Sequence, residues 1–362
     1  MKKDDSLALK GIAIILMVFH HCFRAEKLYE SHIISFYPFS ESFIVNLALM
    51  SKICVSIFAF ISGYGLYISY ARKKTTASRW ALSRYVKTFS GFWFVYVLIA
   101  ILSVFIKNRF ARIYFVDGPY IGIVSVLLDF FGLAKLLNTG TLLGTWWYMS
   151  AAIVFILLTP VIYEAVSGKP FIILTLSLLL LRIILPQVGG EYPGNTSVYA
   201  FIPAFIGGMV FAGCGLFDKW MEFALWHRGR YGKALKCVIE IMVLCVITLL
   251  YFNLPLEKFW GFKFCITPIL FILFFVEFIV PVPGLRSILT FLGKHSMNVF
   301  LIHNYIRTGA FGNLTYSCRH FILVVAFLLT ASLLVSIVLE YAKKIVRYNT
   351  LRDKICCIIE NH

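Results

Sequence analysis

The chain has 362 residues, of which 60% are hydrophobic and 14% are charged, and its formal net charge is +17. Soluble domains average about 45–50% apolar and about 25% charged residues, so this composition excludes an ordinary water-soluble globular protein. The positive charge would suit nucleic-acid binding in a soluble protein. Here the orientation of membrane helices explains it better, and we expect a lipid bilayer and no nucleic acid as partner.

Long apolar runs predict an all-α polytopic membrane protein with about ten transmembrane helices, because about 20 helical residues cross a hydrocarbon core of about 30 Å. The first run ends without a small-residue cleavage site, so we expect it to stay as the first span. The predicted spans are residues 8–24, 43–70, 86–106, 146–165, 170–186, 199–215, 236–252, 263–280, 296–310 and 321–342.

Two stretches of the chain fall outside these ten spans. The run at 113–135 is apolar but contains Asp117, Gly118 and Asp129. We interpret it as an interfacial or re-entrant segment, although a span there would change the topology. The end of the chain, residues 346–362, reads as a short basic cytoplasmic tail after a transmembrane domain at 1–345.

The lysines and arginines orient the predicted helices. Of the 34 lysines and arginines, about 22 lie in the N-terminus, the C-terminal tail and every second loop, and about 10 lie in the opposite loops. Lys52 and Arg182 lie within predicted spans. The excess of basic residues on one side predicts that both termini are cytoplasmic.

The first span, "KGIAIILMVFHH", begins with a lysine and ends with two histidines. Lys10 and His21 are eleven residues apart, about three helical turns, so they share a face about 16 Å apart along the axis. Neutral imidazole accepts a proton from a hydroxyl, which suits His21 to general-base catalysis. Alternatively, Lys10 is a membrane anchor and the histidines are interfacial residues. His20 points about 100° away from His21.

Other polar residues interrupt later spans, and ionisable residues inside a membrane are functional candidates by default. Ser62 to Gly65 can be a packing site and Trp146 to Tyr148 an interfacial belt. His303 follows His295 by about two turns and shares its face, although a buried structural histidine explains either one. The carboxylates and the arginine that fall within or at the ends of spans are Glu164, Arg182, Glu277 and Glu340.

The loop after the second span is the most basic part of the chain. It carries Arg72, Lys73, Lys74, Arg79, Arg84 and Lys87. These residues can anchor the loop to anionic lipid, or they can bind a polyanionic cytoplasmic donor such as a coenzyme A thioester. The nine cysteines show neither a disulfide framework nor metal spacing, and we predict no metal site.

Taken in order, these segments resemble the acyltransferase 3 family of integral-membrane acyltransferases. The family's opening motif, an arginine and a glycine with a histidine eleven positions after the arginine, corresponds to Lys10, Gly11 and His21. Lysine keeps the charge but lacks the planar fork of arginine. Further matches are "IFAFISGYGLY", "SRYVKTFS", "GTWWYMSAAIVFILLTP", "FIPAFIGGMVFA" and "LGKHSMNVFLIH", with Lys87 and Ser90 standing where the family usually has arginine and proline.

The resemblance implies a membrane enzyme, of the kind found in bacterial plasma membranes, that transfers an acyl group, by default acetyl, from cytoplasmic acyl-CoA to a carbohydrate hydroxyl on the outer side. His21 would be the general base. Acetyl-CoA would be a donor substrate, with no permanently bound cofactor. The residues expected to bind it are Lys10, Arg84, Lys87, Arg72, Lys73 and Lys74, and the residues expected to line the same cavity are His20, Tyr148 and His303.

Two other functions fit the sequence. A secondary transporter or flippase of a polysaccharide precursor also places charges inside the membrane, although no inverted repeat is apparent. A non-catalytic partner in polysaccharide assembly would tolerate replacement of His21. The sequence leaves open the acceptor, the acyl chain length, the oligomeric state and an acyl-enzyme intermediate.

Overall fold

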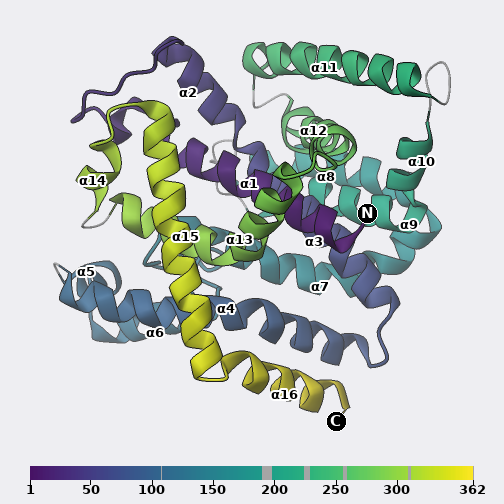
Figure 1. Cartoon of the computed structure of the whole chain (residues 1–362). Helices are drawn as coiled ribbons and strands as arrows, with labels where there is room; N and C mark the ends of the chain where they lie inside the picture. Colours follow the sequence, from purple (N-terminus) through teal and green to yellow (C-terminus); the bar gives the residue numbers. More distant parts are fainter. Residues whose placement is uncertain (107, 190–197, 224–228, 256–258, 309–310, 362) are drawn as a thin grey trace. The chain divides into compact units, whose positions relative to one another are not determined.

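The computed structural model describes residues 1–106, 108–189, 198–223, 229–255, 259–308 and 311–361, and the described part of the chain is mostly helical (Figure 1). Its one β-bridge joins Ser35 and His320. The chain divides into two compact units. Unit 1 comprises residues 1–28, 36–71 and 162–296, and unit 2 comprises 29–35, 72–161 and 297–362.

Unit 1 contains the N-terminal helices and the middle of the chain. Two π-helical turns, η4 and η5, flank α12. Two helices, α7 (Trp147–Gly168) and α13 (Leu285–Thr308), contribute residues to both units. The other helices of unit 1 are α1 (Lys3–Phe23), η1 (Glu26–Leu28), α2 (Glu41–Met50), α3 (Ile53–Ala71), α8 (Pro170–Gly189), η3 (Tyr199–Phe201), α9 (Ile202–Cys214), α10 (Leu216–Glu222), α11 (Arg230–Asn253), η4 (Phe262–Ile266), α12 (Thr267–Phe274) and η5 (Phe275–Ile279).

Unit 2 contains the long helix after the basic loop and the C-terminal helices. Its core is aromatic, with Phe89, Phe92 and Trp146 almost fully buried. Its remaining helices are α4 (Ala77–Phe105), α5 (Arg109–Tyr114), α6 (Pro119–Phe130), η2 (Gly144–Trp146), α14 (Gly312–Tyr316), α15 (Phe321–Ile345) and α16 (Tyr348–Asn361).

The all-α polytopic class predicted from the sequence is confirmed. In the described part of the chain, seven helical stretches are long and apolar enough to cross a membrane. An eighth is added if the pair Tyr199–Cys214 and Leu216–Glu222, bent by 70°, is one span. The seven stretches are Lys3–Phe23, Glu41–Ala71, Ala77–Phe105, Gly144–Gly168, Tyr231–Asn253, Phe262–Ile279 and Phe321–Ile345.

Two of the ten predicted spans are not among the seven stretches or the bent pair. The predicted span 170–186 lies on the 20-residue helix α8, whose first part, Pro170–Leu180, is apolar. The predicted span 296–310 lies on α13, whose polar residues include Lys294, His303 and Arg307. The membrane sides of the termini stay a prediction.

The structure gives the helix bounds within two of the predicted segments. The second predicted span is not one continuous helix, because α2 ends at Met50 and α3 begins at Ile53. The run at 113–135 forms parts of α5 and α6, and α6 has 12 residues. At 1.5 Å per residue α6 is about 18 Å long, too short to cross the hydrocarbon core alone.

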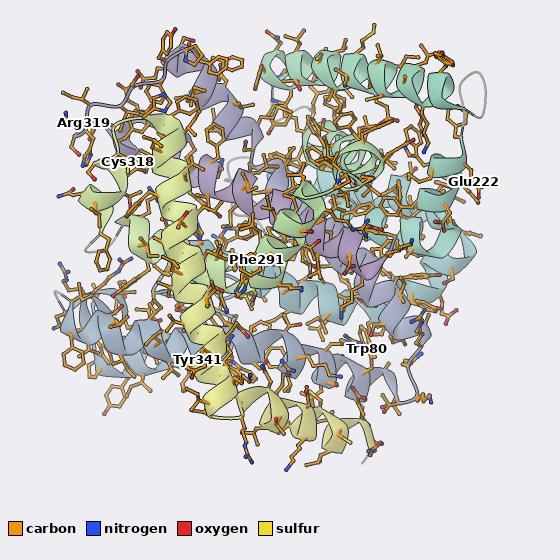
Figure 2. The ribbon with its side chains drawn as sticks, in the orientation of Figure 1. Trp80, Glu222, Phe291, Cys318, Arg319 and Tyr341 are labelled. Carbon is orange, nitrogen blue, oxygen red and sulfur yellow. The ribbon has the colours of Figure 1, made fainter. Side chains whose placement is uncertain are left out.

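Large apolar side chains are exposed along the long helices, as expected where helices contact lipid. On α15, Val338 is 65% and Tyr341 66% exposed. Figure 2 labels Tyr341 on this helix. On α11, Met242 is 61% and Leu249 62% exposed. Contiguous exposed apolar surface marks sites of contact with membrane or protein, and in this membrane protein these faces indicate the lipid-facing surface.

Within unit 1, α3 and α9 pack with their backbones in close contact. A Cβ atom at Gly63 would lie 1.9 Å from the carbonyl oxygen of Phe205, and one at Gly208 would lie 2.0 Å from that of Phe60. Small residues allow this close approach between membrane helices. The two glycines of the "SGYG" segment of α3 therefore have different roles, since a Cβ atom at Gly65 would meet nothing within 4 Å.

This contact leads to a prediction about stability. We expect Gly63→Ala to lower the free energy of unfolding by about 1–3 kcal/mol, because the methyl group forces α3 away from α9. Gly65→Ala is the matched control and should leave stability unchanged or raise it by up to about 1 kcal/mol, through helix propensity. Thermal unfolding in detergent measures both. Equal stabilities for the two variants would contradict the close packing at Gly63.

Candidate active site

Helix α1 carries His21, the predicted base, together with Lys10, predicted to bind the donor, and His20, predicted to line the cavity. Lys10 and His21 are both partly buried, whereas His20 is 4% exposed. Gly11 lies against α13, where a Cβ atom would be 2.1 Å from the carbonyl oxygen of Leu289. The glycine of the opening motif therefore lets α1 pack closely in unit 1.

The His20 side chain is held in place by a hydrogen bond to another helix. Its Nδ1 atom lies 2.7 Å from the carbonyl oxygen of Ala48 on α2. A carbonyl oxygen only accepts, so Nδ1 of His20 donates the proton. The His20 and His21 rings are edge-on with centroids 5.1 Å apart. His20 thus links the end of α1 to α2 and contacts the predicted base.

Two cations belong to the same end of unit 1. Lys52, at the break between α2 and α3, is 6% exposed, and Arg24 is the C-cap of α1. The two lie close enough for their like charges to interact. Sequence reasoning noted Lys52 only as a charge within a span, and its position in an apolar run was the signal that could have identified it.

The residues predicted to bind the donor, apart from Lys10, are in unit 2. Arg72 and Lys74 are exposed and Lys73 is partly buried, all before α4. On α4, the Arg84 guanidinium lies 5.9 Å from the centre of the Trp80 ring. Nζ of Lys87 lies 3.1 Å from Oε1 of Glu360 on α16.

The other predicted cavity residues, Tyr148 and His303, are also in unit 2. His303 is fully buried, and its Nδ1 atom lies 3.0 Å from the carbonyl oxygen of Val299 and 2.9 Å from that of Phe300. The Tyr148 ring contacts the Phe300 ring, with centroids 5.9 Å apart. Tyr148 therefore packs against the part of α13 that carries His303. The role of both residues in lining a cavity stays a prediction.

Sequence reasoning missed a polar network around Asp129 in unit 2. Asp129 is 2% exposed, and its Oδ2 atom accepts hydrogen bonds from the Tyr114 hydroxyl and the Leu142 N–H group. The Tyr96 and Tyr114 hydroxyls lie 3.0 Å apart. Burial raises the pKa of Asp129 to about 6, and the hydrogen bonds from Tyr114 and Leu142 oppose that shift.

The raised pKa of Asp129 predicts a pH dependence of stability. The folded state binds a proton more tightly than the unfolded state, so this contribution is complete below about pH 4 and is lost as the pH rises through about 6. We expect wild type to lose up to about 3 kcal/mol of unfolding free energy across this window. Asp129→Asn, which cannot ionise, should flatten the dependence. Identical pH profiles of thermal unfolding in the two proteins would contradict the prediction.

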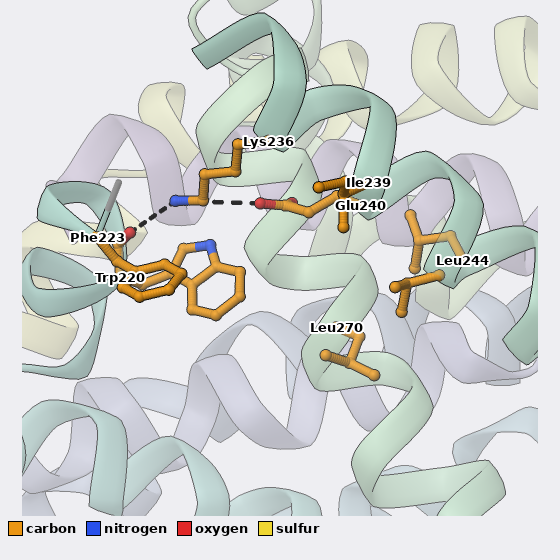
Figure 3. Close-up of a pocket in the computed structure, with 8 residues that line it drawn as sticks. Trp220, Phe223, Lys236, Ile239, Glu240, Leu244 and Leu270 are labelled. Carbon is orange, nitrogen blue, oxygen red and sulfur yellow. Dashed lines mark hydrogen bonds and ion pairs between the residues drawn. The ribbon is translucent and has the colours of Figure 1, made fainter. Parts of the chain in front are cut away.

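A pocket of about 140 Å³ in unit 1 holds a second polar cluster that sequence reasoning missed (Figure 3). Nζ of Lys236 lies 2.7 Å from both the Trp220 carbonyl oxygen and Oε2 of Glu277, and 4.0 Å from Oε1 of Glu240. The Lys236 ammonium also lies 4.7 Å from the centre of the Trp220 ring. The pocket is lined by Trp220, Phe223, Lys236, Ile239, Glu240, Val243, Leu244 and Leu270.

Among the described residues, no group of three or more His, Cys, Asp or Glu side chains is placed to hold a metal ion.

A comparison with protein families matches residues 7–341 to the acyltransferase 3 family, described as an acyltransferase domain. The chain belongs to the acyltransferase 3 family. It is a multi-pass membrane acyltransferase. No curated protein and no solved structure matches the chain.

The family match contains all the residues that carried the resemblance. Lys10, Gly11 and His21 lie in its first part and the "LGKHSMNVFLIH" segment near its end. The match ends at Tyr341, so α16 lies outside it. The contact between α16 and the basic part of α4 is thus a feature of this acyltransferase that the family match does not describe.

Proposed function

We propose that this acyltransferase moves an acyl group, acetyl by default, from cytoplasmic acyl-CoA to a hydroxyl of a cell-surface or lipid-linked carbohydrate, in a bacterial plasma membrane with both termini cytoplasmic. The observation that carries the proposal is the placement of His21. It follows Lys10 by eleven residues on α1 of a confirmed acyltransferase, and its ring contacts a histidine that is hydrogen-bonded to α2.

We assign His21 as the general base. Its unprotonated ring nitrogen takes the proton of the acceptor hydroxyl while the hydroxyl oxygen attacks the thioester carbonyl. A tetrahedral oxyanion forms, the carbon–sulfur bond breaks, and the coenzyme A thiolate leaves and takes the proton from the imidazolium. The products are the ester and free coenzyme A.

Positive charge supports two parts of this chemistry. Lys52 and Arg24 bring cations to the end of α1 and the α2–α3 break, where fixed charge can stabilise an oxyanion. Arg84 and Lys87 on α4, with residues 72–74 of the same unit, supply cations for the phosphates of coenzyme A. Ammonium and guanidinium groups form strong charge-assisted hydrogen bonds to phosphate.

The test is acyl transfer by the purified protein. Detergent-solubilised protein is incubated with acetyl-CoA and candidate carbohydrate acceptors, and the free thiol of coenzyme A is measured. We expect release that depends on the acceptor. Mass spectrometry of surface glycans from cells with and without the protein should show one lost acyl unit per modified residue. Absence of acceptor-dependent release together with unchanged glycans would overturn the proposal.

A further inference from the structure

Helix α16 lies along the first half of α4, within unit 2 (Figure 1). The Tyr348 hydroxyl donates to the Ser90 carbonyl oxygen at 2.9 Å, and the Tyr348 ring contacts the Phe94 ring. Cys356 is 2% exposed, with Sγ 3.8 Å from the Ser83 carbonyl oxygen. One face of α16 is therefore docked on the basic part of α4.

The docked helix presents a single carboxylate to the polar groups of α4. Oε1 of Glu360 accepts a hydrogen bond from the Ser83 hydroxyl and another from Nζ of Lys87, at 3.1 Å. Arg84 is close enough for its charge to act on the same carboxylate. Mainly through the Ser83 hydrogen bond and then the Lys87 hydrogen bond, these donors hold the pKa of Glu360 below its usual range.

The three donors are of the kinds that bind phosphate oxygens. Ser83 is 1% exposed, so its hydroxyl is withdrawn from water and directed at the carboxylate. The Ser83 hydroxyl and the Lys87 ammonium group bind one carboxylate oxygen directly, and the Arg84 guanidinium group adds its charge nearby. An oxyanion is already bound there, and it belongs to the protein itself.

The other acid described on α16 behaves differently. Asp353 has a side chain that is 61% exposed, and it pairs with Arg352 of its own helix at 2.8 Å. Charge on α16 is therefore not generally directed at α4. Glu360 alone, of the two, reaches the Ser83 and Lys87 donors.

We propose that Ser83, Arg84 and Lys87 form an oxyanion site on α4, and that the Glu360 carboxylate fills it as an internal competitor of a phosphate group of the acyl donor. The anion site stands on the contacts above, and only the naming of coenzyme A as its ligand rests on the proposed function. Donor binding then requires Glu360 to leave, so α16 sets the apparent affinity for the donor.

The test compares two probes, inorganic pyrophosphate and coenzyme A, by direct binding to the full-length protein in detergent. Glu360→Gln removes the competing charge but keeps the size of the side chain. If Glu360 fills the site about nine-tenths of the time, the variant should bind both probes about tenfold more tightly. Asp353→Asn, which removes one charge from the same helix, should bind both as wild type does. Adding Lys87→Ala to Glu360→Gln should cancel the gain.

Each outcome decides something different. Unchanged affinity for both probes in Glu360→Gln, or no binding of either probe by any variant, overturns the internal competitor. A tenfold gain for pyrophosphate without coenzyme A binding supports the anion site and overturns coenzyme A as donor. Tighter binding in Asp353→Asn as well would show a general charge effect of α16 and overturn the role of Glu360. Unfolding midpoints of all variants exclude a loss of folded protein.

Discussion

His21→Ala is expected to lower the rate of acyl transfer by about 10²- to 10⁴-fold, the usual contribution of a positioned general base. The variant keeps Lys10, Gly11 and the hydrogen bond between His20 and Ala48, so α1 should stay packed in unit 1. Release of free coenzyme A from acetyl-CoA in the presence of acceptor gives the rate. A folded His21→Ala protein with the wild-type rate would remove the assignment of His21 as base.

His20→Ala separates catalysis from positioning in the same experiment. It leaves the Ala48 carbonyl oxygen without the donor at 2.7 Å in a buried place, which costs about 1–3 kcal/mol. We therefore expect a lower unfolding midpoint and a much smaller loss of specific activity than in His21→Ala. The opposite ranking of activities would identify His20 as the base. His32→Ala, on another segment, should change neither property.

Lys236→Met is expected to cause a large loss of stability, about 3–5 kcal/mol, because it removes one partner of a buried ion pair. The side chains of Lys236 and Glu277 are both 4% exposed, and Oε1 of Glu240 lies 4.0 Å from Nζ of Lys236. Without Lys236, the buried Glu277 carboxylate and the partly buried Glu240 carboxylate lose the cation that they share. Denaturation of the purified protein in detergent measures the loss.

A second variant identifies the cause of that loss. Adding Glu277→Gln to Lys236→Met removes one stranded carboxylate and should recover a large part of the stability. Lys233→Met, an exposed lysine on the same helix, is the control for removing a positive charge and should have an effect within about 0.5 kcal/mol. If Lys236→Met and Lys233→Met are equally mild, the ion pair contributes little to folding.

The sequence by itself determined the class of the fold. Apolar runs near Lys3–Phe23, Ala77–Phe105 and Phe321–Ile345 had to be membrane helices, because transfer to a bilayer depends on the summed hydropathy of neighbouring residues. The opening motif with Lys10 and His21 also followed from the sequence, since a spacing of eleven places both residues on one helical face.

The tertiary structure decided which polar groups meet. His20 binds the carbonyl oxygen of Ala48, Lys236 pairs with Glu277, and Glu360 reaches Ser83 across 277 positions of sequence. No local property of the chain specifies such pairs, because they depend on how helices pack after each has formed. Hydropathy therefore predicted the helices, and the family resemblance singled out His21 as the candidate base. The partners that hold and cover the candidate residues arose only in the folded protein.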